Sequence, residues 1–90
     1  MLILKSTTQF RKDYKLAKKR KLDLSLLEAV LDTLCEEKPL DQKHQDHALT
    51  GKYSGHRECH IQPNWLLIYR VERENLILVA VSTGTHSDLF

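Results

Sequence analysis

The strongest constraint on the fold of this chain is a tight turn between two runs of strand-forming residues. Pro63 and Asn64 are suited to the two central positions of a β-turn, because proline presets φ and asparagine tolerates unusual backbone conformations. The run before the turn, 57–62, mixes ionisable and apolar residues, whereas the run after it, 65–70, is almost wholly apolar. The sequence therefore predicts a β-hairpin whose second strand is buried.

The first strand of this hairpin is the best candidate for chemistry. Side chains alternate along a strand, so Glu58 and His60 share one face while Cys59 and Ile61 share the other. The apolar face can pack against a core, which leaves the ionisable face free. A carboxylate beside an imidazole suits proton transfer, because the neighbouring negative charge favours the protonated ring. A surface ion pair is the simpler alternative.

The segment before the hairpin predicts one strand and two helices. Residues 2–5 form a short apolar run, and the hydroxyl residues that follow can cap a helix. Apolar residues at helical spacing predict a first helix around 10–17. A second helix begins at Asp23 or Ser25, both of which can cap it, and ends before Pro39.

The remaining segments predict strands joined by short turns. Residues 41–55 are polar and predict a loop with one short strand near 48–49. The unbroken apolar run 76–82 is typical of a central strand covered on both faces, and Gly84 ends it. Residues 85–90 predict a turn or a single helical turn. This order of elements indicates an α+β domain with an antiparallel sheet.

The positive charge of the chain is concentrated near its beginning. Residues 5–21 hold eight lysines and arginines against one aspartate, whereas acidic residues outnumber basic ones in the remainder. Such a one-sided field suits a polyanion such as nucleic acid, although a solvated helix face is the alternative. No apolar run approaches the roughly 20 residues of a membrane span, and no signal peptide is evident. We therefore expect a protein of the cytoplasm that does not bind membranes.

Five histidines invite a metal site, but their spacing argues against one. Cys59 and His60 are adjacent and point to opposite faces of a strand, so they cannot readily share one tetrahedral ion. We expect no metal and no cofactor. Metal-free cleavage of RNA needs a base for the 2′-hydroxyl, an acid for the departing oxygen and positive charge near the phosphate. His47, His60 and His86 fall at strand ends or loops, where a sheet can bring them together, although an ordinary surface position is the simpler interpretation of each one.

Three segments resemble a known family. Residues 46–51 (DHALTG), 57–69 (RECHIQPNWLLIY) and 83–90 (TGTHSDLF) together resemble the YafQ branch of the RelE/ParE toxin superfamily, over nearly the whole chain. The resemblance implies a toxin of a type II toxin–antitoxin pair that cleaves messenger RNA in the ribosomal decoding site. It also implies that residues 1–90 form a single domain, with two N-terminal helices packed on a twisted antiparallel sheet of about four strands.

The resemblance also implies roles for individual residues. The three histidines match catalytic positions, Glu58 matches an acidic position beside them, and Trp65 and Phe90 match residues that shape the site. Asn64 is a departure, because the family pattern has an aspartate there and an amide cannot exchange a proton at neutral pH. The expected catalytic residues are His47, Glu58, His60, His86 and Phe90. The residues expected to bind substrate are Arg57, Asn64, Trp65, Lys15, Lys18, Lys19 and Lys21.

The expected partners are a cognate antitoxin that masks the basic surface, the ribosome with its messenger RNA, and operator DNA reached through the antitoxin. Two other functions remain open from the sequence. An inactive co-repressor that binds nucleic acid with its antitoxin is favoured by Asn64. A gyrase poison of the ParE branch is disfavoured by His60, His86 and Phe90, which a ribonuclease needs and a gyrase poison does not.

Overall fold

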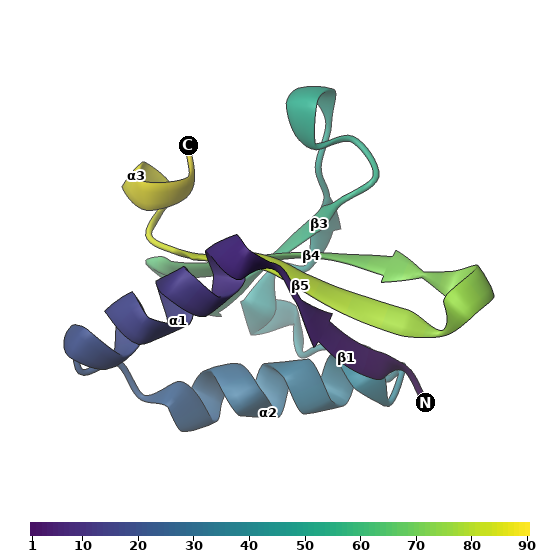
Figure 1. Cartoon of the computed structure of the whole chain (residues 1–90), viewed down its shortest axis with the longest axis horizontal. Helices are drawn as coiled ribbons and strands as arrows, with labels where there is room; N and C mark the ends of the chain where they lie inside the picture. Colours follow the sequence, from purple (N-terminus) through teal and green to yellow (C-terminus); the bar gives the residue numbers. More distant parts are fainter.

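The computed structural model describes residues 1–90 as one mixed sheet with helices on both sides (Figure 1). The strands are β1 (Ile3–Ser6), β2 (His47–Ala48), β3 (Arg57–Gln62), β4 (Trp65–Glu72) and β5 (Ile77–Gly84). The helices are α1 (Thr8–Lys19), α2 (Leu24–Cys35) and α3 (His86–Leu89), with short 3₁₀ turns η1 (Gln42–His44), η2 (Gly51–Tyr53) and η3 (Arg73–Asn75). The α+β class predicted from the sequence is confirmed.

The sheet differs from the prediction in strand number and direction. Five strands lie in the order β1-β5-β4-β3-β2, and β1 pairs with β5 in parallel, whereas the other neighbours are antiparallel. A parallel pair requires a long connection, and here nearly the whole chain lies between the two strands. A four-residue apolar run carries no signal of its direction, so the sequence did not reveal this pairing. The apolar run at the end of the chain is an interior strand as predicted, but β4 is the middle one.

Local capping fixes where the two long helices begin. Thr7 accepts a hydrogen bond from the Phe10 backbone N–H and donates one to the carbonyl of Val81, so the same hydroxyl caps α1 and ties it to β5. Asp23 is the N-cap of α2, since its carboxylate accepts a bond from the Ser25 N–H. The alternative start at Ser25 is therefore excluded.

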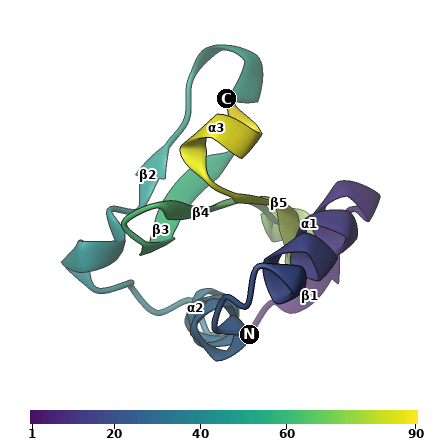
Figure 2. The same cartoon turned by 90° about the vertical axis from the view of Figure 1, so that its left-hand side faces the viewer.

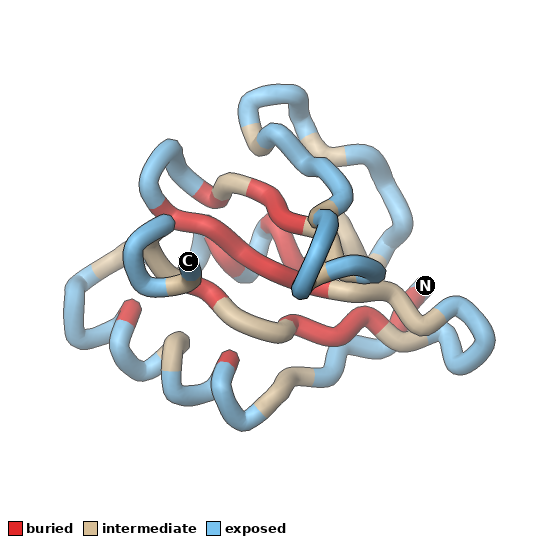
Figure 3. Tube along the Cα trace, turned by 90° about the horizontal axis from the view of Figure 1, so that it is seen from above, coloured by how far each residue is buried: buried red, intermediate tan, exposed pale blue.

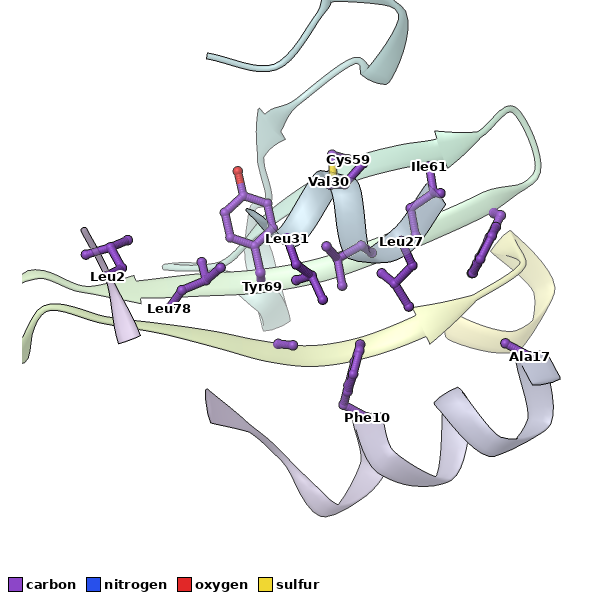
Figure 4. Packing of buried hydrophobic residues seen from close by; sticks show 13 residues of the cluster. Leu2, Phe10, Ala17, Leu27, Val30, Leu31, Cys59, Ile61, Tyr69 and Leu78 are labelled. Carbon is purple, nitrogen blue, oxygen red and sulfur yellow. The ribbon is translucent and has the colours of Figure 1, made fainter. Parts of the chain in front are cut away.

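Both long helices cover one face of the sheet. Figure 4 shows Phe10 and Ala17 of α1, and Leu27, Val30 and Leu31 of α2, pointing into a shared apolar cluster. The strand residues in this cluster include Cys59, Ile61, Leu67 and Tyr69. The predicted division of the first hairpin strand into an apolar and an ionisable face is thus confirmed.

The other face of the sheet carries a smaller group of buried apolar residues than the face that packs against the helices. Leu66 and Ile68 are fully buried and lie opposite His60 and Glu58 in the β3–β4 register. The segment 49–56 and α3 rise from this side, away from α2 (Figures 1 and 2). Seen from above, burial follows the inner strands, whereas both flanking segments are largely exposed (Figure 3). On this face Glu58 is buried and His60 is half-buried, next to two exposed segments. No helix is both long and apolar enough to cross a bilayer.

Candidate active site

The candidate site is built around the carboxylate of Glu58. Glu58 is only 5% exposed, and its Oε1 lies 3.6 Å from His47 Nε2 and 3.8 Å from His60 Nε2. The sheet creates this arrangement, because His47 on β2 is the direct cross-strand partner of Glu58, and His60 follows two residues later on the same face of β3. A buried carboxylate needs a partner for its charge, and either imidazole provides one when it is protonated.

Backbone carbonyls set the orientation of both rings. His47 Nδ1 lies 2.6 Å from the carbonyl oxygen of Gln45, and His60 Nδ1 lies 3.3 Å from that of Pro63. A carbonyl oxygen only accepts hydrogen bonds, so Nδ1 carries the proton in each ring and donates it. Nε2 is therefore the atom that gains or loses a proton in both histidines. Both of these atoms face the same carboxylate oxygen.

Two supporting residues were not identified from the sequence. Gln45 adopts a left-handed conformation at φ 46°, which ends η1 and directs its carbonyl to His47. His44 Nδ1 donates to the backbone carbonyl of His60 across 2.6 Å. No local sequence pattern indicates that His44 would contact the backbone of a strand 16 residues away.

A second cluster joins α3 to the segment 49–56. The rings of His86 and Phe90 lie 5.0 Å apart, and Tyr53 of η2 meets Phe90 edge-on at 5.6 Å. His56 also meets Tyr53 edge-on, at 6.0 Å. Phe90 is 54% exposed, so its ring is available for stacking on another planar group. Tyr53 was missed from the sequence because its neighbour in space, Phe90, lies far along the chain.

Two predicted substrate-binding residues lie on the opposite face. Arg57 lies on the side of β3 that faces the helices, where its Nε donates to Asp46 Oδ1, an atom that also accepts from Tyr69 Oη at 2.6 Å. Trp65 is 3% exposed within the main core, and its Nε1 donates to Thr83 Oγ1. Strand alternation places them there, because Arg57 lies two residues from Cys59 and Trp65 lies two residues from Leu67, so each shares the core-facing side of its strand. Neither side chain accompanies Glu58 and His60.

The remaining predicted substrate-binding residues lie at the β3–β4 turn and at α1. Asn64 is exposed in the β3–β4 turn and lines a cavity of about 410 Å³ between this turn and α1. The lysines are exposed and belong to α1 or follow it directly. These residues are Lys15, Lys18, Lys19 and Lys21. They form a basic surface separate from the histidines.

No three histidine, cysteine or acidic side chains are grouped in a way that could hold a metal ion. The two thiols do not form a reactive centre either. Burial raises the pKa of Cys59 to about 12, and burial also raises that of Cys35, so both remain protonated at neutral pH. The ionisable groups available for chemistry are therefore the imidazoles and Glu58.

Comparison with known proteins identifies the family. A family model for the YafQ toxins, bacterial toxins of type II toxin–antitoxin systems, matches residues 2–90. The chain belongs to the YafQ toxin family. The mRNA interferase toxin YafQ of Escherichia coli K12 is 39% identical over 83 residues, which cover 91% of this chain and 88% of that protein.

Solved structures of bacterial toxins share the whole fold. A metal-bound toxin from Helicobacter pylori matches with a TM-score of 0.95 and 40% identity, over 100% of both chains. YafQ from E. coli BL21(DE3) matches with a TM-score of 0.91 and 34% identity, over 100% of this chain and 99% of that one. YafQ in the E. coli DinJ–YafQ complex matches with a TM-score of 0.90 and 35% identity, over the same shares. This YafQ-family chain thus has the same fold as E. coli YafQ, both when YafQ is alone and when it is in complex with DinJ.

The position of Trp65 generates a prediction about stability. Trp65→Phe should lower the free energy of unfolding by about 1–3 kcal/mol, because it leaves a small cavity and removes the donor to Thr83. Urea denaturation of the variant and the natural chain measures this difference. Tyr53→Phe, which alters a half-buried residue, keeps its ring and loses no internal hydrogen bond, is the control. An unchanged unfolding free energy in Trp65→Phe would contradict a packing role.

Proposed function

We propose that this YafQ-family toxin is an endoribonuclease that cleaves messenger RNA on the ribosome by metal-free general acid–base catalysis. The observation that supports this proposal is the convergence of His47 Nε2 and His60 Nε2 on one oxygen of buried Glu58. The name of the E. coli relative, an mRNA interferase, points to the same substrate. The chemistry below follows from the orientation of the two rings.

One of the three imidazoles of His47, His60 and His86 serves as the base and another as the acid. A neutral ring accepts the proton of the ribose 2′-hydroxyl at Nε2 while the 2′-oxygen forms a bond to the adjacent phosphorus. The bond from phosphorus to the 5′-oxygen breaks, and a protonated ring donates its Nε2 proton to that oxygen. The products are a 2′,3′-cyclic phosphate and a 5′-hydroxyl. Glu58 stabilises whichever ring is protonated, so the pair can exchange these states.

The second cluster supplies a third histidine and a stacking surface. His86 is exposed on α3 beside Phe90, whose ring can stack on a nucleobase of the message. Stacking holds the nucleotide with its phosphate next to the histidines. The binding energy is thus used to orient the reacting groups. We assign His86 to proton transfer and Phe90 to positioning of the substrate.

The partners follow from the basic surface and from the relatives. Lysines on and after α1 are suited to the phosphates of ribosomal RNA. A cognate antitoxin that covers the toxin is supported by the DinJ–YafQ complex of E. coli. We propose that operator DNA is reached through that antitoxin and that the toxin acts in the cytoplasm.

The first prediction concerns the histidines. His60→Ala and His86→Ala should each lower the rate of cleavage by about 10²- to 10⁴-fold, because each removes a general acid or base. Single-turnover cleavage of ribosome-bound message by folded variants measures this loss. Activity should persist in EDTA, whereas loss of activity that added metal restores would contradict a metal-free mechanism. Wild-type rates in both variants would refute the assignment.

The second prediction concerns the absent aspartate. Glu58→Gln should lower the rate more than Asn64→Asp raises it, because Glu58 is the carboxylate that contacts both histidines. The three proteins are compared on the same programmed ribosomes. A natural chain that is inert, and that Asn64→Asp activates by orders of magnitude, would favour the co-repressor function instead.

The third prediction concerns the basic surface. Replacing Lys18 and Lys19 by glutamine should weaken ribosome binding and reduce the slope of its salt dependence by about 1 to 2, because fewer counterions are released. Lys38 and Lys43, which are exposed and lie outside α1, provide a matched pair of substitutions with the same charge change. Ribosome affinity measured over a range of salt concentrations shows whether the two double variants differ. An equal effect of both pairs would indicate a nonspecific charge effect.

A further inference from the structure

The short helix α3 and the residue directly after it carry two of the proposed functional side chains, but this helix cannot be stable by itself. It spans only His86–Leu89, and a single helical turn forms too few internal hydrogen bonds to offset the cost of nucleation. Contacts with other parts of the chain must therefore fix the positions of His86 and Phe90. Two such contacts are present, and the edge-on contact of Tyr53 with Phe90 is one of them.

The other contact is made by the carboxylate of Asp88. Its Oδ2 accepts hydrogen bonds from Arg20 Nη1 at 2.7 Å and from the Thr85 backbone N–H at 2.9 Å. Its Oδ1 lies 3.4 Å from Arg20 Nη2, so the guanidinium engages both oxygens. The Asp88 N–H donates in turn to Thr85 Oγ1, which completes a capping box. One carboxylate thus both caps α3 and ties it to α1.

The backbone makes room for this carboxylate. A Cβ atom added to Gly84 would lie 2.9 Å from Asp88 Oδ2 and 3.0 Å from Asp88 Cβ, which is closer than side chains approach one another. Glycine at the end of β5 therefore permits the close approach of Asp88. The guanidinium of Arg20, followed by the hydrogen bond from Thr85, holds the pKa of Asp88 well below its usual range. The carboxylate remains ionised at every pH at which the toxin is expected to work.

Arg20 differs from the lysines around it. It is the C-cap of α1, and its partner Asp88 lies 68 residues away in the sequence. Lys18, Lys19 and Lys21 form no ion pair. Within the basic segment, Arg20 thus forms an internal ion pair, whereas these three lysines are free for a polyanion.

We infer that Arg20 is a positioning residue of the nuclease: its two-point contact with Asp88 fixes α3 and so places His86 and Phe90 for the reaction. This inference rests on the proposed function for its effect on catalysis. Its structural part, the anchoring of α3 by Arg20, can be tested without any assay of activity. A displacement of about 1 Å in a reacting group can cost on the order of 10²-fold in rate, so a surface contact can matter greatly here.

The experiment compares Arg20→Ala with Arg73→Ala. Arg73 forms a similar ion pair with Glu37 at 2.6 Å, but it belongs to η3 at the β4–β5 turn. Arg20→Ala should lower the single-turnover rate at saturating ribosomes by about 10- to 100-fold. Arg73→Ala should leave it unchanged. Arg20→Lys keeps the charge but loses the two-point contact, so it should recover only part of the rate.

Nuclear magnetic resonance provides the readout that does not depend on activity. In Arg20→Ala, the amide resonances of Leu89 and Phe90 and the ring resonances of His86 should shift or broaden, and the pKa of Asp88 should rise towards its usual value. None of these changes should occur in Arg73→Ala. If the resonances change but no form of the protein cleaves message, the anchoring of α3 stands and the proposed nuclease function fails.

The inference is overturned by a different pattern. If α3 resonances are unchanged in Arg20→Ala and only ribosome affinity and its salt dependence fall, Arg20 is one more phosphate-binding cation. If Arg20→Ala does not fold, Asp88→Asn replaces it in the comparison. This variant retains an oxygen for the Thr85 N–H, removes the charge that pairs with Arg20 and replaces one of the two oxygens that accept from its guanidinium with an NH2 donor. Unchanged α3 resonances and an unchanged saturating rate in Asp88→Asn would likewise refute the inference.

Discussion

The structure depends on the alternation of side chains along β3 and β4. Burial of Cys59, Ile61, Leu67 and Tyr69 against the two long helices is the dominant favourable contribution, and it fixes which face each strand turns to the core. Glu58 must then lie on the opposite face. A slip of one residue in the register would exchange the two faces and destroy core and candidate site together, so stability and function share one constraint.

Burying the carboxylate of Glu58 imposes the next requirement. A charge removed from water is costly unless an opposite charge or hydrogen-bond donors replace the water. His47 and His60 approach the same oxygen, and either ring satisfies it only when protonated. The fold therefore places two imidazoles within reach of one buried carboxylate oxygen. This arrangement suits a reaction that removes one proton and supplies another.

One face of this small sheet packs against the long helices, and the other carries Glu58 and His60. Family resemblance does not say which face a residue lies on, so it does not by itself assign that residue a role. Trp65 stands in a segment typical of the family, yet it packs in the core and bonds to Thr83. The aromatic rings near His86 instead come from Tyr53 of η2 and from Phe90, directly after α3. A loss of activity in a core variant would therefore indicate reduced stability. A loss of activity in an α3 variant would indicate that the substrate or a histidine is no longer positioned correctly.

The sequence by itself determined the features that depend on neighbouring residues. These are the turn at Pro63 and Asn64, the two long helices with their caps, the α+β class, and the shared face of Glu58 and His60. Tertiary structure alone decided the parallel pairing of β1 with β5 and the approach of His47 to Glu58 across two strands. It also decided the contact between Arg20 and Asp88. The physical reason is that alternation, capping and turn preferences act within a few residues, whereas these pairings join distant segments that meet only after the core has packed.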